Sequence, residues 1–327
     1  MPELPEVQTT VAGLQKILPR LVIKDVWTDL AKKNQRIPHF KETLKDLSFY
    51  QKFRREVSGK KVISVERRAK NILINISGGK TILIHMKMTG HIMVGKYSYD
   101  KKTNSWTPAP DEKNLALRDP FNRFIHTVFT LTSPRTTSRP SPYKGEEEFH
   151  LVFCDSRKFG TVKLVARSLL YAPGSMLHAL GPEPLDKNFT FAKFTERLSK
   201  KLNGKIKPVL LDQSIISGIG NIYSDEMLWL AGINPRALVK DIPAVKMKKL
   251  YAGMKSVLAK GIDFGGDSTS DYRDVQGVPG KFSYHHKAYR MTGKRCSKPR
   301  CTGGILRIII GARSAHYCSV HQRLSNK

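Results

Sequence analysis

The stretch "KPVLLDQSIISGIGNIYSDEMLWLAG", residues 207–232, decides how the second half of the chain is organised. It predicts a helix over 207–213, a glycine-bearing turn over 214–221 and a second helix over 222–232. Gly218 and Gly220 leave backbone N–H groups open just before a helix begins, as in an anion site, and Asn221 can add a side-chain donor. A tight turn between two helices explains the same residues without a ligand.

The net charge favours the anion. The 327 residues include 57 Lys+Arg against 27 Asp+Glu, a formal charge of +30. Binding to a polyanion such as nucleic acid explains such an excess, because neutralised phosphates release counterions. A merely soluble charged surface normally mixes both signs. An anionic membrane surface fits less well, since no basic amphipathic helix dominates and no apolar run approaches the ~20 residues of a membrane span.

Strand patterns fill the first half of the chain, after a predicted amphipathic helix over 4–18 that ends at Pro19. Six short runs rich in β-branched or aromatic residues follow, and "NISGGK" (75–80) predicts a hairpin turn. This half is therefore expected to be a β-sandwich or barrel with a leading helix. Segments 97–118 and 133–148 are predicted to be loops, and we assign them no function.

Further helices are predicted over 190–202 and 241–262, so the second half is helical until a polar, glycine-rich stretch begins after 262. The length suits two domains of ordinary size. Glu3 and Glu6 lie where the apolar region of a signal peptide would begin, so we expect no export signal.

A cysteine cluster follows in the last 32 residues, which hold three of the four cysteines. The order is Cys296-x4-Cys301, then 16 residues, then Cys318-x2-His321. Thiolates and an imidazole in two close pairs are typical ligands of tetrahedral zinc. "ILRIII" and "SAHYC" predict two strands between the pairs, with Arg313 at the hairpin tip. Reduced cysteines that fill a small core are the alternative.

Basic motifs recur in the strand half. In "ERRAKN" (66–71), Lys70 is the third cation within four residues, and in "HMKMTG" (85–90) His85 and Met88 are expected on the next strand. A solvated basic edge and core packing are the simpler explanations. In "CDSRKFG" (154–160), Arg157 and Phe159 are two apart and are expected on one face of a strand, a pair suited to insertion beside bases.

These motifs occur together in one known family. "MPELPEV", "RRAK", "HMKMTG", "DSRKFG", "GIGNIYSDE" and "GGDSTSDYRD…GVPGKF" precede a terminal zinc finger, and in this order the sequence resembles the bacterial formamidopyrimidine-DNA glycosylases. The resemblance runs from Met1 to about Gln322. It implies an α+β fold: an N-terminal β-sandwich with a leading helix, a helical domain with a helix–two-turn–helix, and a β-hairpin zinc finger. We expect these domains at 1–170, 171–285 and 286–327.

The resemblance also implies roles for individual residues. Pro2 would become the N-terminal nucleophile once Met1 is removed, with Glu3 as its acidic partner. Lys70 would lie near the lesion and its phosphates. Three side chains would fill the gap left by an extruded base: Met88, Arg157 and Phe159. Three more would bind DNA: His85, Asn221 and Arg313.

The implied function is a bifunctional DNA glycosylase and abasic-site lyase that removes oxidised purines from duplex DNA in base excision repair. The implied cofactor is one structural Zn²⁺, held by Cys296, Cys301, Cys318 and His321. The enzyme is expected to be a monomer in the bacterial cytoplasm, with no membrane partner. The first ligand spacer, four residues, and the final histidine both differ from the usual four-cysteine finger.

Two rival functions stay open. Relatives of the endonuclease VIII type act on oxidised pyrimidines, but they tend to begin "MPEGPE", whereas Leu4 fits the purine branch. The segment from Gly265 to Phe282 also resembles the family's loop over oxidised purines. The second rival is a zinc protein that binds DNA without catalysis. The presence of Pro2, Glu3 and Lys70 argues against this rival.

Overall fold

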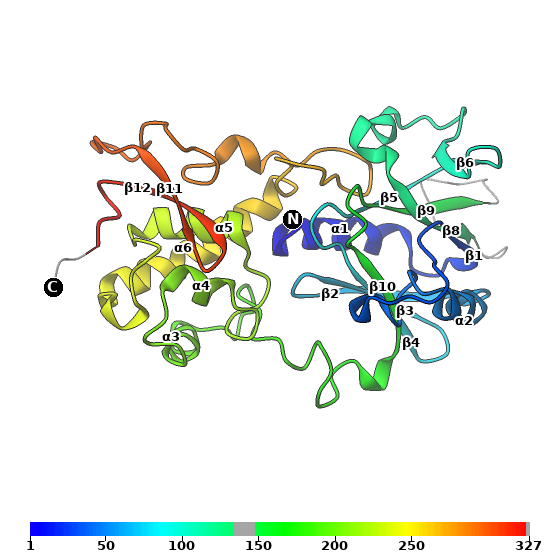
Figure 1. Cartoon of the computed structure of the whole chain (residues 1–327), viewed down its shortest axis with the longest axis horizontal. Helices are drawn as coiled ribbons and strands as arrows, with labels where there is room; N and C mark the ends of the chain where they lie inside the picture. The colour runs from blue at the N-terminus through cyan, green and yellow to red at the C-terminus, as the bar shows by residue number, and fades with distance from the viewer. Residues whose placement is uncertain (134–147, 325–327) are drawn as a thin grey trace. The chain divides into compact units, whose positions relative to one another are not determined.

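The computed structural model describes residues 1–133 and 148–324. The chain divides into two compact units, one formed by 1–178 with 265–280 and the other by 179–264 with 281–327 (Figure 1). Segment 265–280 thus groups with the first half of the chain although it was expected in the second domain. The predicted boundaries at 170 and 285 stay a prediction. Among the described helices, none is long and apolar enough to cross a membrane.

Two four-stranded antiparallel sheets form the first unit, in the orders β1-β8-β9-β5 and β10-β4-β3-β2. Two separate sheets make this a sandwich, so the barrel alternative is wrong and the predicted sandwich is confirmed. The strands are β1 Val22–Thr28, β2 Val62–Arg68, β3 Asn71–Ile76, β4 Lys80–His85, β5 His91–Gly95, β8 Ile125–Thr132, β9 Phe149–Cys154 and β10 Thr161–Ala166.

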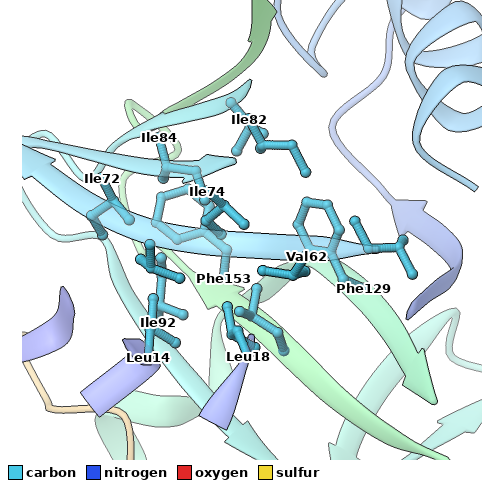
Figure 2. Close-up of a cluster of buried hydrophobic side chains, with 14 of the residues drawn as sticks. Leu14, Leu18, Val62, Ile72, Ile74, Ile82, Ile84, Ile92, Phe129 and Phe153 are labelled. Atoms are coloured by element: carbon cyan, nitrogen blue, oxygen red, sulfur yellow. The ribbon is translucent and has the colours of Figure 1, made fainter. Parts of the chain in front are cut away.

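The core lies between these sheets and is closed by α1 (Leu4–Ile17). Figure 2 shows Ile72 and Ile84 of one sheet gathered with Phe153 of the other, and Leu14 and Leu18 at the end of α1 packed beside them. The predicted turn joins β3 to β4 through Gly78 and Gly79, both with positive φ. Helix α2 (Leu47–Val57), capped by Asp46 and anchored by buried Phe53, was not predicted.

The predicted loop over 97–118 is wrong in part, because it contains a hairpin. β6 (Tyr97–Asp100) pairs with β7 (Ser105–Pro108), and short 3₁₀ turns follow at η2 (Leu115–Arg118) and η3 (Pro120–Arg123). Its strands are stabilised by aromatic contacts, since Tyr99 and Trp106 pack on each other and on Trp27 of β1. The predicted loop 133–148 lies almost wholly outside the described residues.

The second unit is helical and carries a hairpin. Its helices and strands are α3 Phe191–Ser199, α4 Ile206–Leu211, α5 Asn221–Ala231, α6 Ala244–Asp263, β11 Ile305–Ile310 and β12 Arg313–Cys318. The short 3₁₀ turns elsewhere in the chain are η1 Pro38–Phe40, η4 Arg167–Leu169, η5 Val239–Asp241 and η6 Phe282–His285. Tyr223, Leu250 and Met254 are buried in the core of this unit. Each predicted helix is present.

We expect His150 to make the first unit sensitive to acid. Its Nδ1 accepts the Tyr97 N–H at 3.2 Å, which requires a neutral ring, and burial lowers its pKa to about 4. Unfolded His150 would take up a proton near pH 6.5, so its contribution to stability is complete above pH 6.5 and is lost as the pH falls towards 4, by at most about 3 kcal/mol.

His150→Gln should therefore flatten the loss of unfolding free energy between pH 6.5 and 4, as measured by urea unfolding. An unchanged slope would contradict this assignment. His178→Gln, which alters an exposed histidine, is the matched control.

Candidate functional site

The first turn of α1 holds the chain's N-terminal residues in place. Met1 is exposed, whereas Pro2, Glu3 and Glu6 are buried. Glu3 and Glu6 form a capping box in which the Glu3 N–H donates to Glu6 Oε2 at 2.7 Å. Glu6 Oε1 accepts the Asp267 N–H at 2.7 Å, so one carboxylate fixes both the helix start and segment 265–280. Removal of Met1 would leave the Pro2 nitrogen as a secondary amine on this fixed turn.

Lys70 lies in the turn between β2 and β3, where Ala69 adopts a positive φ. Arg67 ties this turn to α1, since its Nε donates to Gln8 Oε1 at 2.8 Å and its Nη1 donates to the Ala69 carbonyl at 3.0 Å. Lys70 is 7% exposed. The structure thus anchors the predicted lysine beside the helix that carries Pro2.

His85 ends β4 and pairs with Asn71, the residue after Lys70. Burial, followed by the charges of Lys87 and Lys70, lowers the pKa of His85 to about 3, so the ring is neutral at pH 7. Its Nδ1 accepts the Lys87 N–H at 3.0 Å. The proton of the neutral ring therefore resides on Nε2, which makes His85 an uncharged donor suited to a phosphate oxygen.

The structure brings Met88, Arg157 and Phe159 together. Arg157 Nη1 lies 3.3 Å from Met88 Sδ, and the Arg157 guanidinium lies 4.8 Å from the centroid of the Phe159 ring. Met88 is 37% exposed and Phe159 is 42% exposed, so both apolar side chains are open to solvent. The expectation that Arg157 and Phe159 share a face of a strand is wrong: β9 ends at Cys154, and both lie in the loop before β10.

A buried carboxylate, that of Asp155, holds the two loops that carry these side chains. It accepts the Gly160 N–H at 2.6 Å, the Arg157 N–H at 3.3 Å and the Thr89 hydroxyl. Gly160 has no room for a side chain, because a Cβ would lie 2.4 Å from the Phe153 ring. Asp155 was not singled out from the sequence, although an acid followed at once by a turn is a usable signal.

The predicted turn joins α4 to α5, but the expectation of an open N–H at Gly218 is wrong, because Gln213 accepts it. Gly218 has a φ of +87° and donates its N–H to Gln213 Oε1 at 2.9 Å, while Gln213 Nε2 donates to the Ile219 carbonyl at 2.8 Å. Asn221 begins α5, and its Nδ2 lies 3.3 Å from Ser314 Oγ of β12. Its Oδ1 has no partner among the described residues, so the opposite amide orientation would accept from Ser314 and free the NH₂ to bind an anion.

A buried charge network joins this turn to the β11–β12 hairpin. Lys207 Nζ contacts Asp225 Oδ1 at 2.5 Å and the Asn221 carbonyl at 3.1 Å, and both charged side chains are fully buried. Asp225 Oδ2 accepts the backbone N–H of His316 at 3.1 Å and lies 2.8 Å from its Nδ1. The network fixes the strand that begins at exposed Arg313 relative to Asn221. Sequence reasoning missed it.

The four predicted metal ligands converge. One ligand atom each from Cys296, Cys301, Cys318 and His321 lies within 4.8 Å of the others. The Cys301 and Cys318 Sγ atoms are 3.5 Å apart, and His321 Nδ1 is 3.4 Å from Cys296 Sγ and 3.8 Å from Cys301 Sγ. Tetrahedral zinc with these ligands would place them about 3.4–3.8 Å apart, so the donor set fits the ion.

Outer contacts also suit a metal site. His321 Nε2 lies 3.0 Å from the Trp229 carbonyl, which orients Nδ1 towards the thiolates. Trp229 Nε1 and the backbone N–H groups of Gly303 and Val320 each donate to a different cysteine sulfur at 3.4 Å. His316, which is close in sequence, is bound to Asp225 instead and does not belong to the cluster.

Two family models match the chain. The formamidopyrimidine-DNA glycosylase N-terminal domain matches residues 1–162, and the formamidopyrimidine-DNA glycosylase H2TH domain matches residues 180–273. The formamidopyrimidine-DNA glycosylase of Herpetosiphon aurantiacus is 35% identical over 323 residues, covering 98% of this chain and 100% of the relative. That of Pelotomaculum thermopropionicum is 33% identical over 326 residues, covering 99% and 100%.

Solved structures of the Lactococcus lactis Fpg are similar over the whole chain. A complex with DNA that contains an abasic site superposes with a TM-score of 0.76 at 27% identity, covering 98% of this chain and 100% of that one. A complex of a mutant with DNA that contains Fapy-dG gives the same TM-score and identity, covering 99% and 100%.

We expect Asp155→Asn to destabilise the loops that carry Met88 and Arg157. The amide keeps the size of the side chain but replaces a charged acceptor of several hydrogen bonds, so the unfolding free energy should fall by about 1–3 kcal/mol. Urea unfolding measures this loss. Asp100→Asn, which alters an exposed carboxylate that also accepts two hydrogen bonds, is the matched control and should change stability by less than about 0.5 kcal/mol.

Proposed function

The chain belongs to the formamidopyrimidine-DNA glycosylase family and is a DNA glycosylase, and we propose that it excises oxidised purines from duplex DNA and then cleaves the abasic strand. The observation that carries this proposal is the buried N-terminal turn, where the capping box of Glu3 and Glu6 fixes the backbone that follows Pro2. Relatives bound to abasic-site DNA and to Fapy-dG DNA support the substrate class.

Pro2 is the proposed nucleophile. An α-amino group has a pKa of about 8, so a useful fraction is neutral at pH 7, whereas a lysine near 10.4 is almost wholly protonated. The Pro2 nitrogen attacks C1′ of the sugar, the C1′–N bond to the damaged base breaks, and the base leaves after taking up a proton. The Pro2 nitrogen loses its proton, the C1′–O4′ bond of the sugar breaks as O4′ takes up a proton, and an iminium forms between C1′ and the nitrogen. This iminium acidifies the neighbouring sugar protons, and β- and then δ-elimination break the two phosphate ester bonds.

Glu3 is the proposed proton carrier beside this nitrogen. Glu6 accepts the backbone N–H groups of Glu3 and Asp267, and Glu3 is the acid next to the Pro2 nitrogen in the sequence. Its place at the start of α1 favours a negative charge, which would offset the iminium. Glu3 would also transfer protons during opening of the sugar ring.

Extrusion of the target base leaves a hole in the stack that must be filled. Met88, Arg157 and Phe159 are proposed to fill it. Two exposed apolar side chains flank an arginine here, on loops that Asp155 makes rigid. Arg157 can donate hydrogen bonds to the base left without a partner, while Phe159 stacks on its neighbours.

DNA phosphates are proposed to bind at both units. Lys70 and neutral His85 serve the first unit, while Asn221 and Arg313 serve the second. Zinc, when bound by the four ligands, would cross-link the two ends of the hairpin segment. The chain itself then holds Arg313 through the pairing of β11 with β12 and through the contact of His316 with Asp225.

We expect Pro2→Gly to abolish the borohydride-trapped protein–DNA adduct, because no pyrrolidine ring remains to hold a secondary amine in the turn. DNA binding should be largely kept. The substrate is a duplex with one 8-oxoguanine opposite cytosine. Mass spectrometry of the N-terminus confirms that Met1 is absent. Equal turnover by the variant would contradict the assignment of the nucleophile.

The wild-type protein in this experiment also separates the rival functions. An adduct on an oxidised-pyrimidine duplex alone would favour an enzyme of the endonuclease VIII type. No adduct on either duplex, with a verified free Pro2, would leave a DNA-binding protein without catalysis.

We expect one equivalent of zinc per chain, held by the cysteine and histidine cluster. Cys318→Ser should lose the metal and lower the thermal midpoint, as measured by elemental analysis and calorimetry. Cys154→Ser is the matched control, because this buried thiol lies outside the cluster and contacts the Asn122 carbonyl. Full zinc content in Cys318→Ser would contradict the ligand set.

A further inference from the structure

Segment Gly265–Gly280 packs directly on the first turn of α1. The Asp267 N–H donates to Glu6 Oε1 at 2.7 Å, and the Tyr272 hydroxyl donates to the Glu6 carbonyl at 3.0 Å. Gly266 lies so close that an added Cβ would meet Glu6 Cγ at 3.0 Å. The segment therefore covers the turn that carries Pro2.

Arg273 anchors this segment from within. It is 5% exposed, and its guanidinium lies over the Phe121 ring at 4.6 Å. Nε and Nη2 form a fork on both Asp119 oxygens at 3.1–3.2 Å, and Nη1 donates to the Ser270 and Tyr272 carbonyls at 3.2 and 2.9 Å. A buried guanidinium with this many partners strongly favours a single conformation of the backbone that it contacts.

Residues 114–122 supply the other side of this contact. Asp119 starts η3 by accepting the Phe121 N–H at 2.8 Å. Asn114 Nδ2 donates to the Gln276 carbonyl at 2.8 Å, and Asn122 Nδ2 lies 3.4 Å from the Gly277 carbonyl. Side chains of 114–122 thus clasp 273–277 at three points. The last residues of segment 97–118, to which we assigned no function from the sequence, therefore hold 273–277 in place.

The same segment also reaches the loop that carries Arg157. Ser156, which directly precedes Arg157, donates its hydroxyl to Asp271 Oδ2 of the segment. Segment 265–280 therefore spans the distance from the proposed nucleophile to the proposed gap-filling side chains. In the proposed function, a base held for attack by Pro2 would lie beside this segment, because the segment contacts the turn that follows Pro2.

We propose that Asp119 and Arg273 are positioning residues for the target base. Their ion pair holds segment 265–280 in the conformation that accommodates the extruded base, a role that rests on the proposed glycosylase function. Excision of a damaged base depends on this conformation. Cleavage at a preformed abasic site does not, because no base is present to be held.

Two conservative variants test the pair. Asp119→Asn keeps an acceptor for the Phe121 N–H but removes the charge, and Arg273→Lys keeps the charge but cannot form the fork. We expect kcat/KM for 8-oxoguanine excision to fall by about tenfold, while incision of a preformed abasic site stays within about twofold. Asp25→Asn is the matched control, because Asp25 forms an exposed fork with Arg54 and should change neither rate.

A second measurement does not depend on the substrate. Hydrogen exchange at the Asp267 amide should be faster in Asp119→Asn than in the wild-type protein and unchanged in Asp25→Asn. Equal exchange at the Asp267 amide in the wild-type protein and in Asp119→Asn would overturn the inference. An equal fall in the rates of base excision and abasic-site incision would also overturn it, because the ion pair would then have a merely structural role. A wild-type protein that neither excises nor incises overturns the proposed function instead, and the exchange result then decides the role of the pair.

Discussion

The hydrogen bonding of Glu6 at the start of α1 is the interaction on which the proposed chemistry depends. One buried carboxylate accepts the N–H of Glu3 and that of Asp267, so it fixes the N-terminal turn and the segment above it together. The same solution recurs elsewhere. Asp155 binds the N–H groups of its own loop, and Glu226 accepts those of residues 287–289 at 2.8–2.9 Å. A buried carboxylate is stable only when such donors surround it, and so each one fixes the backbone that it binds.

Charge is divided between two roles in this molecule. Buried cations such as Lys207 and Arg273 have specific acidic partners, because an unpaired ion in the interior is strongly destabilising. The large excess of Lys+Arg over Asp+Glu means that few acids are left to balance the rest of the surface. A polyanion is the partner that such a surface favours, in agreement with relatives that are bound to DNA.

Local pattern predicted the elements well wherever apolar residues repeat with a clear period. The helices of the second unit, the turn at Gly78 and Gly79 and the β11–β12 hairpin all follow from sequence. Prediction failed where tertiary contacts decide. The hairpin β6–β7 is held by Trp27 from a distant strand, and α2 depends on burial of Phe53. Arg157 and Phe159 were expected on a strand, but the hydrogen bonds of Asp155 turn the chain there instead.

The sequence by itself determined the residue types of the candidate site: the N-terminal proline and acid, the three side chains proposed to fill the gap, and a set of thiol and imidazole ligands at zinc spacing. These are short-range features, readable because chemistry requires particular side chains at particular spacings. Only the tertiary structure decided what holds them. The fork of Arg273 on Asp119, the link from Lys207 through Asp225 to His316, and the contact of Glu6 with Asp267 join residues 18 to 261 positions apart. No local pattern encodes such pairs, because the two partners are distant in the sequence and meet only when the chain folds.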